Sequence, residues 1–477
     1  TQRFTHKMDA LLSTGALPVG STGFDVDNSI QCGANSDNEW FYRDNPTAGN
    51  KRTFTFSFWH KRSQVQGYEA DNYLMSQGSN ARFHFAAHTL RFMFDGNSTE
   101  MEAAGKLRDC AAWYHIVLAI DTTQGTNTNR VKAYVNGVEY PFNNSDWPSQ
   151  NAESSWMSGT DMYFNTRDGD GSYDNNGYWA EVAVIDGSAL GPTSFGEFDS
   201  DSGIWKPKDF KDDVTFGSQG FYLKFDNASD LGNDSSGNNN DVTLNNLSSA
   251  DQAVDTPTNN FCTGNDNANV HVVSGQLLTR GGTKYTNPSG RNWQTIIGTV
   301  GLDAGKWYWE FETDATGAFL GIADVEDATV PWNKNGYFLG YGDNNSSTTK
   351  SLGMYSANGV IYNDSASNTG LSYGSGNKVA CALDMDNRKI YFAVNNNWAN
   401  SANPANGTNG ATWNTSWSDT VYPAGSCAQN NSIFFIYGGY TSLSSYTNTD
   451  ANGYGGFYYT PPSGFYAICT KNLAEYG

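Results

Sequence analysis

The sequence has few of the residues that metal binding and nucleophilic catalysis require. Among its 477 residues there are only six cysteines and six histidines, and charged residues make up 16%. No two cysteines form a CxxC pair and none stands at a zinc-ligand spacing to a histidine, so we expect no zinc site. Isolated cysteines such as Cys381, in the apolar run KVACALDMD, are expected to be small buried hydrophobic residues.

Long apolar segments are also absent. No run approaches the roughly 18 to 20 apolar residues that span a bilayer. The N-terminal stretch TQRFTHKMDALLSTGALPVG lacks the apolar core of a secretory signal. We therefore expect a chain without signal peptide or transmembrane segment that does not insert into a membrane.

Positive charge is scarce. The chain has 28 lysines and arginines against 49 acidic residues, which gives a net charge of -21. Phosphate backbones and anionic head groups are bound by clustered Lys and Arg. We therefore expect neither nucleic acid nor a membrane surface as a partner, and the acidity either suits a calcium-rich medium or serves solubility alone.

Recognisable catalytic motifs are missing as well. There is no GxSxG elbow, P-loop, dinucleotide-type glycine fingerprint or HExxH. A glycosidase on a sandwich fold would need two carboxylates that face a cleft about 5 to 9 Å apart. Glu310 with Glu312, and Asp384 with Asp386, share strand faces by alternation, but neither pair forms the ExDxxE arrangement of jelly-roll glycosidases. We predict a protein that is not an enzyme, with no catalytic residues.

Aromatic residues are abundant instead, at 14% of the chain, and they alternate with polar ones. From Arg52 the two-residue alternation runs through TFTFSFWHKRS, WYHIVLAIDTT and RVKAYVNGVEY, with Gly, Asn, Asp and Ser at the turns. Phe54, Phe56 and Phe58 fall on one strand face, which predicts a sandwich core. Similar strands recur from near Val270, and helical periodicity is absent. The pattern predicts an all-β fold of tandem antiparallel β-sandwiches, jelly-roll or lectin-like, with an N-terminal arm.

Changes of composition divide the chain into four segments. We expect an N-terminal arm over residues 1–50, a first sandwich over 51–200, and a second sandwich over 265–477. Between the sandwiches, residues 201–264 are rich in Asn, Gly and Ser. We interpret them as a linker with one or two strands, which could also complete a sandwich.

Each block resembles a known family. FSFW, WYHIVLAID, RVKAYVNGV and YWAEVAVIDG together resemble the laminin-G-like, concanavalin-A-like lectin superfamily. The second block resembles a SPRY (B30.2) domain through GKWYWEFE from Gly305, GIAD from Gly321, VACALDMDNRKIYFAVNN and the late VYPA. In that family loops at one end recognise the ligand, so the resemblance implies that Trp309 and Phe311 are structural.

The tandem order of the blocks, with ALGPTSFGEF between them and PPSGFYAICTKNL at the end, resembles structural proteins of tailed bacteriophages. This implies a virion protein made in the host cytoplasm: a decoration, fibre or tail-associated subunit. Its partners would be copies of itself in a trimer or dimer, other virion proteins and a host-surface glycan. A free carbohydrate-binding lectin, calcium-dependent or not, and an enzyme acting on polysaccharide remain alternatives.

Calcium is the one cofactor that the sequence suggests. In RDGDGSYDNNG, oxygen-bearing side chains alternate as this ion requires: Asp168, Asp170, Ser172 and Asp174. Tyr173 replaces the glycine of an EF-hand and Trp179 replaces its bidentate glutamate, so an EF-hand is excluded. Laminin-G-like domains often bind calcium at such loops, whereas an Asx-rich turn would need the same residues. The same alternatives apply to a second acidic loop, with Asp226, Asp230, Asp234 and Asp241.

Aromatic residues in the loops of the second block are candidates for glycan or protein binding. Exposed rings stack on pyranose faces while Asn and Asp bond the hydroxyl groups, and NNNWANSANPANGTNGATWNTSW has this composition. Sandwiches also bury many aromatic residues, so core or interface positions remain the alternative. The candidate residues are Trp332, Tyr337, Tyr373, Trp398, Trp413 and Trp417.

Overall fold

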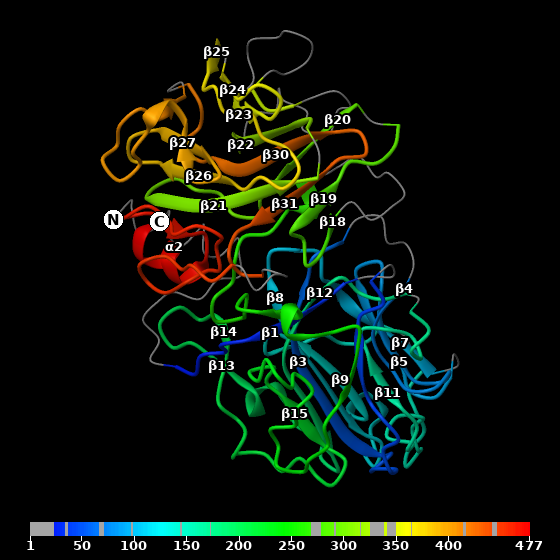
Figure 1. Ribbon diagram of the computed structural model, residues 1–477. Coiled ribbons are helices and arrows are strands. Elements are labelled where there is room, and N and C mark those ends of the chain that lie inside the picture. The colour runs from blue at the N-terminus through cyan, green and yellow to red at the C-terminus, as the bar shows by residue number, and fades with distance from the viewer. Residues whose placement is uncertain are drawn as a thin grey trace. The chain divides into compact units, whose positions relative to one another are not determined.

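The chain folds into two compact units in a computed structural model (Figure 1). We call residues 20–259 the N-terminal unit and residues 260–477 the C-terminal unit. Both units consist of sheets whose strand pairs are antiparallel except for the pair of β21 and β32, so the predicted all-β fold is confirmed. The structure describes residues 23–33, 37–65, 71–96, 99–143, 146–171, 173–268, 278–290, 292–314, 316–324, 338–340, 350–363, 365–413, 416–440 and 446–477.

The N-terminal unit contains two large sheets. The eight-stranded sheet has the order β10 (Val138–Glu139), β9 (Val131–Val135), β8 (Trp113–Asp121), β3 (Thr53–Arg62), β12 (Gly177–Asp186), β1 (Ser29–Cys32) and β17 (Gln252–Ala253), with β15 (Phe221–Leu223) also on β12. The seven-stranded sheet has the order β16 (Thr243–Asn245), β2 (Trp40–Arg43), β11 (Met162–Phe164), β4 (Asp71–Ser76), β5 (Arg82–Ala86), β6 (Thr89–Met93) and β7 (Glu100–Lys106). A small sheet joins β13 (Gly196–Phe198) to β14 (Trp205–Pro207).

The core of this unit lies between the two large sheets. Phe54, Phe56 and Phe58 of β3 are buried in one hydrophobic cluster, as their alternation predicts. The Phe58 ring lies 6.1 Å from that of Phe83 on the opposite sheet. Burying one such side chain stabilises a fold by about 1.5–3 kcal/mol. The alternating face thus joins the two sheets into a sandwich.

The segments expected as arm and linker contain strands of this sandwich. Residues 1–22 lie outside the described part of the chain, but β1 pairs with β12 and β2 pairs with β11. In the Asn-rich segment, β15 pairs with β12, β16 with β2 and β17 with β1. These strands span only two to four residues, too few for alternation to distinguish them from turns. The second interpretation of residues 201–264, strands that complete a sandwich, describes them better than a linker does.

The C-terminal unit also contains two large sheets. The nine-stranded sheet has the order β18 (Leu278–Thr279), β19 (Lys284–Thr286), β31 (Ser432–Ile436), β21 (Lys306–Thr313), β26 (Val379–Asp384), β27 (Lys389–Val394) and β28 (Asn397–Trp398), with β29 (Ala411–Thr412) on β27 and β32 (Tyr466–Ala467) on β21. The six-stranded sheet has the order β20 (Trp293–Ile297), β30 (Tyr422–Ala428), β22 (Ala318–Ala323), β23 (Ser351–Tyr355), β24 (Val360–Asn363) and β25 (Ser365–Asn368).

Helical structure is sparse. The short 3-10 helices are η2 (Asn127–Asn129), η3 (Pro192–Ser194), η4 (Ser249–Asp251), η5 (Asp266–Ala268) and η6 (Ala399–Ser401). The α-helix α2 (Thr470–Tyr476) follows the last strand. Within the described ranges no helix has the length and apolarity needed to cross a membrane.

The two faces of β21 have different roles. Trp309 and Phe311 are buried in the core of the C-terminal unit, which confirms the structural role expected for them. On the opposite face, residues 446–469, which we call the C-terminal strap, contribute Phe457 and Phe465 to a second cluster with Ala382. The strap therefore covers part of the outer face of the nine-stranded sheet.

Candidate functional site

The loop between β11 and β12, residues 165–176, is held against the seven-stranded sheet. The Tyr73 N–H of β4 donates to the Tyr173 carbonyl at 2.9 Å, and the Asp168 N–H donates to Ser76 Oγ at 2.8 Å. Gly169 has φ +70°, and a Cβ there would lie 2.7 Å from the Tyr163 ring. The loop therefore needs glycine at its closest approach to the sheet.

Five side chains gather at this loop, and we call them the tyrosine–arginine cluster: Tyr73, Arg82, Arg167, Asp168 and Tyr173. The Arg167 guanidinium lies 5.6 Å from the Tyr173 ring centre and 6.0 Å from that of Tyr73. Arg82 lies 5.9 Å from the Tyr73 ring. Tyr173 is 38% exposed although it has φ +62°, which is uncommon for a bulky residue. The cluster offers solvent an aromatic ring beside guanidinium and carboxylate groups.

A second aromatic pair lies on the same sheet. Tyr42 of β2 and Tyr163 of β11 are half-buried and stack with their ring centres 5.2 Å apart. The Tyr163 hydroxyl donates to Asp161 Oδ2 at 3.2 Å. Burial and the charge of Asp161 raise the pKa of Tyr163 to about 12, so the hydroxyl keeps its proton. The pair gives the seven-stranded sheet further aromatic side chains that are partly exposed.

The predicted calcium ligands of this loop have different surroundings. Among the described residues, no three His, Cys, Asp or Glu side chains are grouped so that they could hold a metal ion. Burial raises the pKa of Asp168, while the charges of Arg82 and Arg167 oppose that shift. The two guanidinium groups thus place beside this carboxylate the positive charge that a bound cation would supply. Burial also raises the pKa of Asp174 to about 7, and Asp170 lies on the exposed side of the loop. Ser172 lies outside the described residues.

The second acidic loop is a hydrogen-bonded turn. Asp234 is buried and accepts the N–H groups of Tyr222, Ser236 and Asn240. Asp241 accepts the Asp234 N–H at 2.8 Å. Asp226 pairs with Lys224, and the Asp230 N–H donates to a backbone carbonyl. These contacts agree with an Asx-rich turn.

The four aromatic candidates that the structure describes do not form one exposed surface. Tyr373 is buried, and its hydroxyl donates to the carbonyls of Met354 and Ala318. Trp413 and Trp417 are 5% and 4% exposed and belong to the core, so their ring faces are not open to a sugar. Trp398 is half-buried against the cluster of the C-terminal strap. Trp332 and Tyr337 lie outside the described residues. For Tyr373, Trp413 and Trp417 the alternative of a core position describes the structure, because side chains near Asn-rich turns can point inward.

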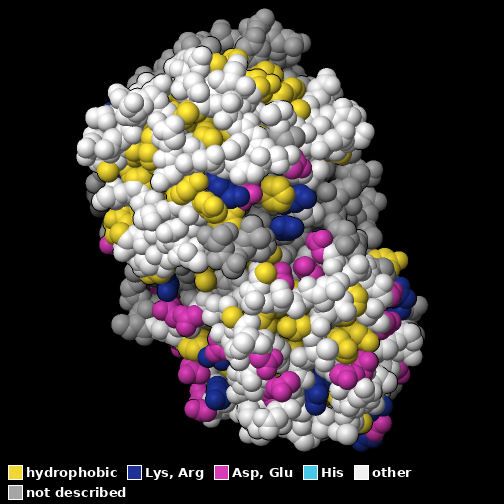
Figure 2. All heavy atoms as spheres, in the orientation of Figure 1, with side chains coloured by type: hydrophobic (Ala, Val, Ile, Leu, Met, Phe, Trp, Pro, Cys, Tyr) yellow, Lys and Arg dark blue, Asp and Glu magenta, His cyan; other side chains and the backbone are white. Residues whose placement is uncertain are grey.

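Sequence reasoning missed a row of side chains on the outer face of the nine-stranded sheet. Phe434 of β31 pairs with Lys284 of β19 on one side and with Glu312 of β21 on the other. Lys284 Nζ lies 5.1 Å from the Phe434 ring, and Lys378 Nζ lies 2.7 Å from Glu312 Oε1. Lys378 also lies 5.3 Å from the ring of Tyr458, which is 38% exposed. Figure 2 shows Lys and Arg side chains beside hydrophobic ones over these strands.

One buried pair has the composition of a nucleophile and its base, but the wrong protonation. Ser57 Oγ lies 3.0 Å from His115 Nε2, while the Trp205 indole N–H donates to His115 Nδ1 at 3.0 Å. Burial lowers the pKa of His115 to about 3, so the ring is neutral. Because Nδ1 accepts a hydrogen bond, the ring proton is on Nε2. This nitrogen donates to Ser57 and cannot take its proton.

The two units match two family models. Residues 30–192 match the model described as concanavalin A-like lectin/glucanases superfamily, named Laminin_G_3. Residues 306–440 match the SPRY domain model. The chain thus joins a concanavalin A-like domain to a SPRY domain, as the motifs indicated. A search of curated proteins found no match.

Three of the similar solved structures show distant likeness. The SPRY domain of human HERC1 is 17% identical, with 32% of this chain and 87% of that chain covered and a TM-score of 0.24. The TRIM65 PSpry domain is 16% identical, with 37% and 91% covered and a TM-score of 0.27. A heptameric SAP-like pentraxin from Limulus polyphemus is 15% identical, with 35% and 79% covered and a TM-score of 0.26. Likeness at this level carries no argument about function.

Proposed function

We propose that this chain is a non-enzymatic binding protein and that its N-terminal unit binds carbohydrate through the tyrosine–arginine cluster. The exposed ring of Tyr173, beside Arg167 and Asp168, supports this proposal most directly. An aromatic ring stacks on the apolar face of a sugar, and guanidinium and carboxylate groups hydrogen-bond its hydroxyl groups. The match to a superfamily that includes lectins agrees with it.

The surroundings of the buried carboxylates favour binding over catalysis. Glu310 accepts the N–H groups of Tyr458 and Tyr459, each at 2.8 Å. Asp384 accepts the side-chain amide of Asn387 and pairs with Lys306 at 3.1 Å. A glycosidase needs one carboxyl that donates a proton and another that is free to attack or to activate water. These carboxylates instead hold neighbouring backbone and side chains.

Glycan binding is tested with the full chain on an array of immobilised glycans. We expect Tyr173→Ala to weaken binding to any glycan retained by the parent by about tenfold, as loss of an aromatic anchor does. Tyr458→Ala is the matched control, because Tyr458 is equally exposed but lies in the C-terminal unit. Unchanged binding by Tyr173→Ala would exclude the cluster as the site.

We further propose that the protein acts as a virion subunit of a tailed bacteriophage. This rests on the tandem order of the two domains and on the motifs that flank them. The test is electron microscopy of intact phage particles from the source, labelled with a gold-conjugated antibody against this protein. We expect the label on the head or on the tail. Absence of label on intact and gently opened particles would favour the free lectin, which should bind sugar as an isolated monomer.

A further inference from the structure

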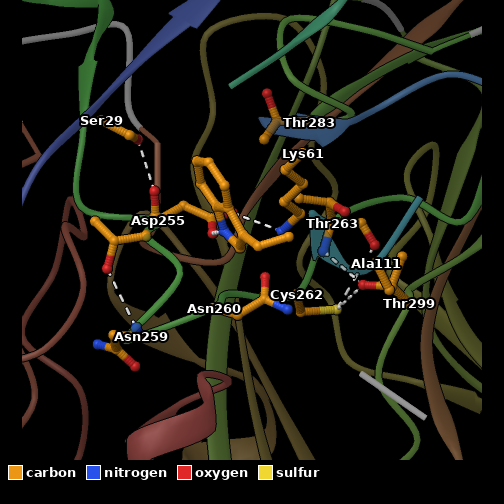
Figure 3. A network of polar contacts seen from close by, with 12 residues as sticks. Ser29, Lys61, Ala111, Asp255, Asn259, Asn260, Cys262, Thr263, Thr283 and Thr299 are labelled. Carbon is orange, nitrogen blue, oxygen red and sulfur yellow. Dashed lines mark hydrogen bonds and ion pairs between the residues drawn. The ribbon is translucent and has the colours of Figure 1, made fainter. Parts of the chain in front are cut away.

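A lysine and an aspartate meet in the interior of the N-terminal unit. Lys61 Nζ lies 2.7 Å from Asp255 Oδ2, and their side chains are 0% and 1% exposed. Lys61 belongs to β3, near the middle of the eight-stranded sheet, and Asp255 follows β17. The two side chains point toward one another (Figure 3). The pair therefore joins two segments that are 194 residues apart in the sequence.

The neighbours of this pair fix its geometry. Lys61 pairs with Trp113 of β8 on one side and with Tyr178 of β12 on the other. The Trp113 indole N–H donates to Asp255 Oδ1 at 3.0 Å. The Ser29 hydroxyl donates to the Asp255 backbone carbonyl at 2.6 Å. The amine and the carboxyl group are thus held in contact by fixed partners on three strands.

An ion pair that is removed from water loses several kcal/mol of solvation per charge. A single proton shift from Nζ to Oδ2 removes both charges and leaves a neutral amine against a neutral carboxylic acid. The neutral amine is a nucleophile, and the carboxylic acid is a far better acceptor for it than a carboxylate is. One proton transfer within the pair thus supplies both reactants of an amide condensation.

We propose that Lys61 and Asp255 condense to form an intramolecular isopeptide bond. The lone pair of Lys61 Nζ attacks Asp255 Cγ, so an N–C bond forms and a negative charge develops on Oδ1. The Cγ–Oδ2 bond then breaks, and Oδ2 leaves as water with its own proton and one from the amine. No oxidation or reduction occurs, and no other reactant is needed.

One neighbour can assist this step. The Trp113 N–H already points at Oδ1, where the charge develops, in the manner of an oxyanion hole. The cross-link would tie the end of the unit to its central strand and restrict the unfolded chain.

The test is the mass of the purified full chain under denaturing conditions. We expect a mass lower than that of the sequence by one water molecule. Trypsin should release a branched peptide in which residues 53–62, uncleaved at Lys61, are joined to residues 225–280. A full sequence mass would overturn the proposal, as would a water deficit without the branched peptide, because dehydration at an Asp-Gly site has the same mass.

Two variants make the test specific. Lys61→Arg keeps a positive charge but lacks a nucleophilic amine, so we expect its full sequence mass. Lys51→Arg changes a partly exposed lysine of the same unit, paired with Glu153 at 3.7 Å, and should retain the deficit and the branched peptide. A water deficit that persists in Lys61→Arg would show that the loss arises elsewhere.

Discussion

At the scale of single residues, Glu181 is in an unusual position. It is buried in the middle of β12 with φ +51°, where the register of the β3–β12 pair shifts between Ala180 and Ala183. Its carboxyl group accepts a hydrogen bond from the Tyr222 hydroxyl. Burial raises the pKa of Glu181 from 4.5 to about 7, against the opposing effect of Tyr222. The bulge thus places an ionisable group inside the sheet.

This shift predicts a pH dependence of stability. Between pH 4.5 and about 7 the folded protein binds more protons at Glu181 than the unfolded chain does, so the free energy of unfolding falls as the pH rises. Asp174, whose pKa burial also raises to about 7, acts in the same direction. Glu181→Gln should remove up to about 3 kcal/mol of this fall. Urea unfolding below pH 4.5 and above pH 7 measures the free energy of unfolding at both ends of this range. If that free energy falls as much in Glu181→Gln as in the parent, the assignment to Glu181 is contradicted.

Residue-scale prediction from the sequence succeeded where neighbours constrain a side chain. Phe54, Phe56 and Phe58 alternate within a long strand, so their common face was predictable. Trp413 and Trp417 lie in irregular backbone, where no period says which side chains point inward. The sequence marks Tyr173 only as a departure from an EF-hand, because its exposure depends on a left-handed backbone that the residue type does not predict.

At the scale of elements, Glu310 attaches the C-terminal strap to β21. Its carboxylate is buried and accepts the Tyr308 hydroxyl at 2.7 Å and the N–H groups of Tyr458 and Tyr459. The sequence put Glu310 and Glu312 on one face of a strand, which the contacts of both residues support. It could not predict the strap, because NTDANGYGGFYYTPPSGFY has no strand or helix periodicity.

Removing this attachment should loosen the strap. Glu310→Ala leaves two backbone N–H groups without their acceptor, at about 1–3 kcal/mol each. We expect faster hydrogen exchange in peptides from residues 446–469 and no change in peptides from the N-terminal unit. Glu310→Gln keeps one oxygen acceptor and should have a smaller effect. Equal protection of the strap in all three proteins would show that its apolar contacts suffice.

At the scale of the whole molecule, short strands without a recognisable sequence pattern determine where the N-terminal unit begins and ends. The motifs of this unit fall between residues 52 and 190, and the matched family model covers residues 30–192. The compact unit is longer, from residue 20 to residue 259. The segments outside the motifs supply core residues: Ile30, Phe41, Phe221, Leu223 and Phe225.

A fragment of residues 20–259 should therefore unfold cooperatively, whereas a fragment of residues 51–200 should not. The shorter fragment lacks β1, β2, β15, β16 and β17, and it lacks the buried apolar side chains of Ile30, Phe41, Phe221, Leu223 and Phe225. At about 1.5–3 kcal/mol for each side chain, their loss is comparable to the whole stability of a typical domain, about 5–15 kcal/mol. Thermal unfolding followed by near-ultraviolet circular dichroism compares the two fragments. A sharp transition in the shorter fragment would mean that β3, β8 and β12, with the sheet opposite, form a sufficient core alone.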